Sequence, residues 1–297
     1  MDLPRAYRIR ERPLSAEDYD VPIGWWGWNW EPPVPMSLTE LLAAGNFDAR
    51  TAAVVWLALE SHGSMLIAAE EPHSGKTTTL TAFLDLVPFS VRRVFVRGWA
   101  ETFDLVRWTD PAQTLLLVNE LSSHLPVYLW GPKAVQTFRL LRRGYALAST
   151  LHADSAEEAA AQLTGELGVQ PADLARVDVL MVMRMHRAGA YGPIARRAVA
   201  LHRPVLAANG GLDLVRLVEW RARGDTFEHD EAAQLELLSL RRGGPRAALA
   251  SEIEQRAAFL LTLCERRVRA IPEVRAAIAR FRDEPAPRQP RGDPTRG

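Results

Sequence analysis

Short apolar runs alternate with helical segments through the middle of the chain. Largely apolar runs predict buried strands at residues 64–69, 91–97, 114–118, 145–150, 177–184 and 195–202. Between them lie segments whose periodicity and Gly or Pro boundaries predict helices. Strands that are apolar almost throughout, separated by helices, are typical of an α/β fold with a mostly parallel sheet covered on both faces.

Polar residues at the expected helix starts support this interpretation. Ser37 with Glu40, and Ser155 with Glu158, have the spacing of a capping box, and Asp48 can cap the helix that follows it. Further helices are predicted at residues 77–87 and 131–144.

Composition divides the chain into four parts. Residues 1–36 are rich in Trp and Pro and predict an irregular arm, whose indoles either pack on the protein's own surface or form a patch for a partner. Residues 37–205 hold the strand–helix alternation. Residues 206–284 show helical periodicity and predict a small all-helical C-terminal domain, and the Pro-, Arg- and Gly-rich residues 285–297 predict a disordered tail.

Charge and cysteine content narrow the functional classes. The 36 basic residues equal the 36 acidic residues in number, so no overall field attracts nucleic acid, and we expect no direct nucleic-acid partner. A single cysteine, Cys264, excludes an internal disulfide framework and fits a reducing cytosol. The N-terminus lacks the apolar run of a signal peptide, and no window is long enough to span a bilayer. A cytoplasmic protein that reaches a membrane only through a partner is therefore expected.

The stretch EEPHSGKTTTL, residues 70–80, ends like a phosphate-binding loop, G-x-x-x-x-G-K-[ST]. It lies between a predicted strand and a predicted helix, where helix N-terminal amides would face phosphates. Lys76, one of only two lysines in the chain, would supply a point charge, and Thr77 a hydroxyl ligand for Mg²⁺. The residues predicted to bind ATP are His73, Ser74, Gly75, Lys76, Thr77 and Thr78. His73 is expected beside the nucleotide rather than as a catalyst, and the alternative to the whole motif is a chance Gly-Lys-Thr in a strand–helix turn.

Carboxylates stand where such loops usually begin with glycine. Glu70 occupies the position of the first glycine, and Glu71 follows it. Pointing inward, each would repel the phosphates by roughly 2–3 kcal/mol at an effective dielectric near 20, whereas pointing outward they would cost little.

An acid and a histidine follow two later strands. Glu120 ends the apolar run TLLLVNE, where it could hold the Mg²⁺ shell or polarise an attacking water. His152 follows the strand YALAST, at the sheet edge where ligands gather, and could donate to a γ-phosphate oxygen. The alternative for His152 is a loop histidine without a role in chemistry, beside caps from Asp154 or Ser155.

Three of these segments, in order, resemble the secretion ATPases of type II and type IV systems. GKTTTL, LLLVNE and GYALASTLHADSAEEAAAQL are similar to the Walker A, Walker B and His-box motifs of that family, over roughly residues 37–205. The resemblance implies a RecA-like P-loop NTPase core, ATP and Mg²⁺ as cofactors, and a homo-hexamer on inner-membrane secretion or pilus platform proteins, at the cytoplasmic face. It implies Lys76 and Thr77 as nucleotide and Mg²⁺ ligands, Glu120 as a metal-shell and catalytic acid, and His152 as a catalytic residue.

Several positions differ from the family pattern. Gly98 and Trp99 stand where acids are expected between Walker A and Walker B, with only Glu101 nearby. Asn119 precedes the Walker B acid in place of glycine. Candidates for an arginine that reaches a neighbouring subunit are Arg92, Arg93, Arg142 and Arg143, each of which could also be a surface charge. The leading hypothesis is an ATP-hydrolysing assembly motor. One alternative is a nucleotide-binding regulatory subunit with little turnover. A second alternative is a RecA-like nucleic-acid translocase, although the zero net charge argues against it.

Overall fold

The computed structural model describes residues 14–21, 35–71, 73–187 and 192–283. The Trp-rich run at residues 24–34 and the tail at 285–297, for which an irregular arm and disorder are predicted, lie outside the described residues.

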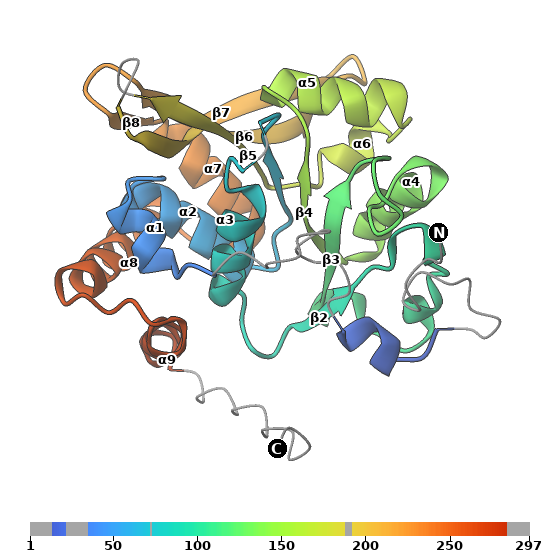
Figure 1. Cartoon of the computed structure of the whole chain (residues 1–297), viewed down its shortest axis with the longest axis horizontal. Helices are drawn as coiled ribbons and strands as arrows, with labels where there is room; N and C mark the ends of the chain where they lie inside the picture. The colour runs from blue at the N-terminus through green and yellow to red at the C-terminus, as the bar shows by residue number, and fades with distance from the viewer. Residues whose placement is uncertain (1–13, 22–34, 72, 188–191, 284–297) are drawn as a thin grey trace.

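One eight-stranded sheet forms the centre of the molecule, in the order β2-β3-β4-β1-β5-β6-β7-β8 (Figure 1). The first five strands in this order run parallel to one another, and β6, β7 and β8 extend the sheet antiparallel. The strands are β1 (Met65–Ala68), β2 (Arg92–Phe95), β3 (Thr114–Leu121), β4 (Ala146–Leu151), β5 (Val179–Arg187), β6 (Ile194–Leu206), β7 (Leu212–Arg221) and β8 (Thr226–His229). The predicted α/β class with a mostly parallel sheet is confirmed.

Helices cover both faces of this sheet (Figure 1). They are α1 (Leu38–Ala43), α2 (Ala49–Glu60), α3 (Lys76–Phe83), α4 (Gly131–Leu140), α5 (Ala156–Ala161), α6 (Pro171–Leu174), α7 (Glu231–Arg242), α8 (Arg246–Glu265) and α9 (Ile271–Phe281). Alternate residues of β1 point to opposite sides: Met65 and Ile67 join the core under α1, α2 and α3, whereas Leu66 and Ala68 join the core under α4 and α5. This two-sided burial explains why the central strands are apolar throughout.

The expectation that residues 206–284 are all helical is wrong in its first part. Strands β7 and β8 occupy residues 212–229 and complete the main sheet. β7 lies between β6 and β8, and β8 is the edge strand; β7 buries Leu217 and Val218 but otherwise, like β8, mixes exposed with partly buried positions, so neither has the continuous apolar run that marks β1 or β3.

The remaining C-terminal helices are tied to the core by shared apolar contacts. Leu238 of α7 and Ile253 of α8 are fully buried in one cluster with Val54 and Leu57 of α2. Leu260 of α8 belongs to the same core as the strands.

Helix starts follow the sequence signals closely. Ser37 and Glu40 make both hydrogen bonds of a capping box, and Asp48 accepts from Thr51 N at 2.8 Å. Ser155 also caps its helix, but Glu158 reaches Asp154 N instead of Ser155 N. The second capping box is therefore only half formed, because the returning carboxylate bonds one residue further upstream.

Within the described part of the chain, no helix combines the length and apolar character that crossing a membrane requires.

Candidate active site

The predicted phosphate loop lies at the centre of the sheet's carboxyl edge. Strand β1 ends at Ala68 between its two neighbours, with Ala68 paired to Leu151 of β4 and to Val182 of β5. The loop then leads into α3, which begins at Lys76. Because carboxyl ends of parallel strands share one edge, the ends of β3 and β4 meet the loop there.

The loop backbone turns sharply before α3. His73 has φ 60° and Gly75 has φ 91°, both in the left-handed region that favours glycine. Arg196, on β6 two strands away from β1, donates from Nε to the His73 carbonyl at 2.8 Å. A Cβ atom on Gly75 would lie 3.1 Å from Cδ of Arg196, so glycine permits this close approach. Sequence reasoning missed Arg196, because only strand pairing brings it to the loop.

Lys76 is buried against its own loop. Its ammonium donates to the Ala69 carbonyl at 2.7 Å, and the residue is 8% exposed. Burial lowers the pKa of Lys76, while the nearby carboxylates of Glu120 and Glu70 oppose that shift. The lysine and the acid predicted from separate motifs are thus close enough to interact electrostatically.

The loop has polar groups suited to phosphate oxygens. The first N–H groups of α3, from Lys76 onward, have no carbonyl partner within the helix, as at any helix start. Ser74 Oγ is buried and has no hydrogen-bond partner among the described residues. An unpartnered buried hydroxyl beside free amides fits a bound phosphate, and Thr77 in the first turn offers the hydroxyl predicted for Mg²⁺.

The two carboxylates at the start of the loop differ in their contacts. Glu71 Oε2 accepts from the backbone N–H of Met185 on β5 at 3.1 Å, so this carboxylate is bound to the neighbouring strand. Glu70 is exposed, and its carbonyl lies 3.2 Å from Nδ1 of His152. The Glu71 carboxylate therefore has the outward orientation, in which it causes little repulsion of a bound phosphate.

Glu120 and His152 lie against each other at the ends of β3 and β4. His152 Nε2 is 3.1 Å from Glu120 Oε1, and Glu120 is 7% exposed. The Glu120 carboxylate raises the pKa of His152, against the opposing effects of burial and Lys76. The structure thus brings together residues that sequence motifs placed in separate strands.

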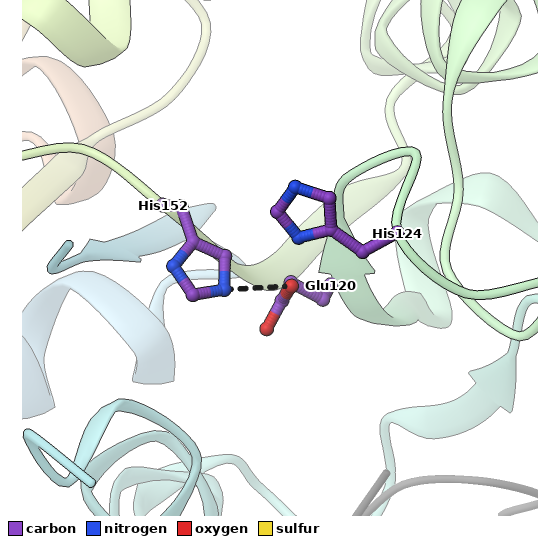
Figure 2. Close-up of side chains that lie close together, drawn as sticks. All are labelled: Glu120, His124 and His152. Atoms are coloured by element: carbon purple, nitrogen blue, oxygen red, sulfur yellow. Dashed lines mark ion pairs between the residues drawn. The ribbon is translucent and has the colours of Figure 1, made fainter. Parts of the chain in front are cut away.

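A second histidine, His124, completes this cluster and was not predicted (Figure 2). It comes from the loop after β3, and its ring lies 5.5 Å from that of His152, centroid to centroid. Leu129 N donates to Glu120 O at 2.9 Å, and Ser122 N donates to Leu129 O at 3.2 Å, so the loop folds back beside β3. No sequence signal marks His124, because its position depends on this return.

Glu101 is the acid nearest to Gly98 and Trp99, where the resemblance predicts acids, and its carboxylate is fully engaged in hydrogen bonds within the fold. It is 2% exposed and accepts hydrogen bonds from Tyr19 Oη, Phe103 N and Arg97 N, the last at 2.9 Å. Burial raises the pKa of Glu101. Its carboxylate thus joins Tyr19 of the N-terminal segment to the turn at Arg97 and Phe103.

Three of the four candidate arginines are held within the chain. Arg92 pairs with Asp20 at 3.0 Å, Arg93 donates to the Leu84 carbonyl at 2.9 Å, and Arg142 makes a two-pronged contact with Asp173. Arg143 lies exposed beside Arg142.

Comparison with known proteins gives relatives without a stated function. No family model matches the chain. It is 29% identical over 158 residues to uncharacterized protein MJ0900 of Methanocaldococcus jannaschii, covering 45% of this chain and 27% of that protein. It is 24% identical over 251 residues to uncharacterized protein MJ1287 of the same organism, covering 76% of this chain and 91% of that one.

Among solved structures, the chain is similar to the Legionella pneumophila ATPase DotB, with a TM-score of 0.40 and 13% identity. The match covers 76% of this chain and 58% of DotB. The chain thus spans little more than a quarter of MJ0900 and just over half of DotB.

Proposed function

We propose that this protein binds Mg-ATP at residues 73–78 and hydrolyses it. The observation that carries the proposal is the convergence of Lys76, Glu120 and His152 at one edge of the sheet. Lys76 is a buried cation at the start of α3, and the buried acid and the histidine lie at the ends of β3 and β4.

The residues divide the chemistry between them. Lys76 exchanges its bond to the Ala69 carbonyl for the β- and γ-phosphate oxygens, together with the first amides of α3. Glu120 orients a water molecule and accepts its proton as the water oxygen attacks the γ-phosphorus and the bond to ADP breaks. Protonated His152 donates to the departing phosphate. A Mg²⁺ ion, held by Thr77 and through Glu120, supplies charge neutralisation when bound.

The biological role that we propose is an assembly motor. The support is the order GKTTTL, LLLVNE, GYALASTLHADSAEEAAAQL, which resembles type II and type IV secretion ATPases. Such a motor would act as a homo-hexamer at the cytoplasmic face of the inner membrane, on secretion or pilus platform proteins and without direct nucleic-acid contact. A nucleotide-binding regulatory subunit is the second candidate. It is favoured because Glu101, the acid nearest to the position where the resemblance predicts acids, is hydrogen-bonded to Tyr19 within the fold.

Phosphate release and ATP binding by the full chain test the proposal. Lys76→Ala should weaken ATP binding at least about 10-fold, because a buried charge-assisted phosphate contact is lost. The only other lysine provides a matched control: Lys133 bonds the Trp99 carbonyl on an exposed surface, so Lys133→Ala should leave binding unchanged.

The two candidate roles give different results in the same assay. Saturable ATP binding with turnover that Lys76→Ala removes supports the ATPase. Binding without turnover supports the regulatory subunit, and equal binding by wild type and Lys76→Ala contradicts the nucleotide site. Size-exclusion chromatography with and without a slowly hydrolysed ATP analogue tests the hexamer.

A further inference from the structure

Glu120, His124 and His152 form a group with the composition of a transition-metal site. One ligand atom from each residue can be chosen so that all three atoms lie within 4.8 Å of one another. Figure 2 shows both imidazole rings next to the Glu120 carboxylate, with the His152–Glu120 contact dashed. From this geometry we propose that the three side chains bind a divalent transition metal of the Zn²⁺ class, separately from the Mg²⁺ that accompanies ATP.

The contacts of His152 leave a place for a cation. Its two ring nitrogens both face acceptors: Nδ1 is 3.2 Å from the Glu70 carbonyl, and Nε2 is 3.1 Å from Glu120 Oε1. A neutral imidazole carries one N–H and can satisfy only one of them. With Nδ1–H donated to Glu70 O, the Nε2 lone pair and the Glu120 oxygen can share one metal ion. A backbone carbonyl behind a ligating histidine is a common second contact at metal sites.

Glu120 has an oxygen available for such an ion. Despite the short distance to His152, no aligned hydrogen bond from the described residues reaches Oε1, which is buried. When His152 is neutral with its proton on Nδ1, this buried oxygen has no donor, which is costly, and a bound cation would remove that cost.

The spacing needs only a small adjustment. Bonds of about 2.0–2.1 Å at tetrahedral angles place ligand atoms about 3.4 Å apart, close to the 3.1 Å between His152 and Glu120. The ligand atom of His124 lies within 4.8 Å of the others and must move by at most about 1.4 Å to reach this spacing, which its exposed side chain permits. Its backbone N–H donates to Ser122 Oγ at 3.2 Å. Three protein ligands leave a further position for water, as in open zinc sites.

The donor set discriminates between metals. Two imidazoles and one carboxylate suit Zn²⁺, Co²⁺ or Ni²⁺, whereas Mg²⁺ prefers oxygen ligands and retains its water. The Lys76 ammonium, which interacts electrostatically with Glu120, donates its hydrogen bond to the Ala69 carbonyl at 2.7 Å.

Metal binding would withdraw two residues from the reaction proposed above. While they hold the metal, Glu120 cannot accept the proton of the attacking water and His152 cannot donate to the departing phosphate, so Zn²⁺ should inhibit turnover. This inhibition rests on the proposed ATPase activity, whereas the binding itself does not.

The test uses metal-stripped, nucleotide-free full-length protein titrated with Co²⁺ alone. Wild type should bind one equivalent and develop the visible absorption of nitrogen-ligated, low-coordinate Co²⁺, which Zn²⁺ then abolishes by displacement. His124→Ala, His152→Ala and Glu120→Gln should each weaken binding at least about 10-fold. His186→Ala is the matched control, because His186 lies on β5 against Trp220 and should leave the titration unchanged.

A second measurement keeps the result interpretable if a variant is unstable. Zn²⁺ should raise the thermal midpoint of wild type and His186→Ala, and should not raise that of folded His124→Ala. A wild-type spectrum identical to that of the aqueous ion overturns the proposal, as does equal affinity in wild type and His124→Ala. The titration contains no nucleotide, so its result does not depend on ATPase activity. Metal binding by a protein without ATPase activity would contradict only the proposed function. ATPase activity in a protein that binds no metal would contradict only this inference.

Discussion

Replacing Glu101 tests whether this acid supports the fold or the chemistry. The change Glu101→Gln keeps the size and shape of the side chain but exchanges one acceptor oxygen for an NH₂ group. Oε1 receives Tyr19 Oη and Phe103 N, and Oε2 receives Arg97 N at 2.9 Å. The amide can keep the first two bonds only by turning its NH₂ toward Arg97 N–H, which leaves two donors facing each other in a buried site.

The magnitude follows from these three bonds. A hydrogen bond to a charged group contributes about 1.5–3 kcal/mol, and an unpaired buried donor adds a similar cost. Removing the buried charge offsets part of this, because burial raises the pKa of Glu101 and disfavours its ionised form. We expect Glu101→Gln to lower the free energy of unfolding by about 2–3 kcal/mol, and Tyr19→Phe, which removes one donor, by about 1–2 kcal/mol.

Urea unfolding followed by circular dichroism measures these values, and a double-mutant cycle isolates the Tyr19–Glu101 coupling. A coupling energy of about 1 kcal/mol or more is expected. The reasoning is refuted if Glu101→Gln changes stability by less than about 0.5 kcal/mol while abolishing ATP turnover, since Glu101 would then serve catalysis.

Other contacts give predictions of the same kind. Arg196→Ala should weaken ATP binding about 10-fold by releasing the phosphate loop, with Arg196→Lys intermediate; equal affinity of all three proteins in equilibrium titration would contradict this. The Glu120 contact raises the pKa of His152, so its stabilisation is complete below the unfolded value of 6.5 and is lost as pH rises through the folded pKa. The stability advantage of wild type over His152→Asn should therefore shrink as the pH rises above 6.5, and a gap that widens would show the opposite sign. Arg241→Ala, measured by urea unfolding, should cost about 2–3 kcal/mol because it leaves the buried Asp178 carboxylate without its cation, and a loss below about 0.5 kcal/mol would show that other groups compensate.

Much of the candidate site could be predicted because it depends on short-range patterns. The apolar run at β1, the Gly75-Lys76 pair and the following helix are contiguous in sequence, so the strand–loop–helix unit follows from the apolar run and the phosphate-loop motif. Glu120 and His152 were placed together by one general rule, that carboxyl ends of parallel strands share an edge.

The features that sequence reasoning missed depend on long-range pairing. His124 reaches the cluster only because its loop returns to β3, and Arg196 only because β6 pairs antiparallel with β5. The partner of Glu101 is Tyr19, 82 positions away, which no local pattern indicates. Strands β7 and β8 escape the sequence pattern because a half-solvated antiparallel strand has no continuous apolar run.

The behaviour of Glu120→Gln tests the central claim, that the phosphate loop and the buried acid act on the same ATP. Affinity for ATP and the rate of phosphate release are measured on the same preparations of wild type, Glu120→Gln and the exposed-acid control Glu157→Gln. We predict that Glu120→Gln retains ATP affinity within about threefold of wild type and loses at least about 100-fold in turnover, because a general base contributes about that much. Unchanged turnover in Glu120→Gln would contradict the account.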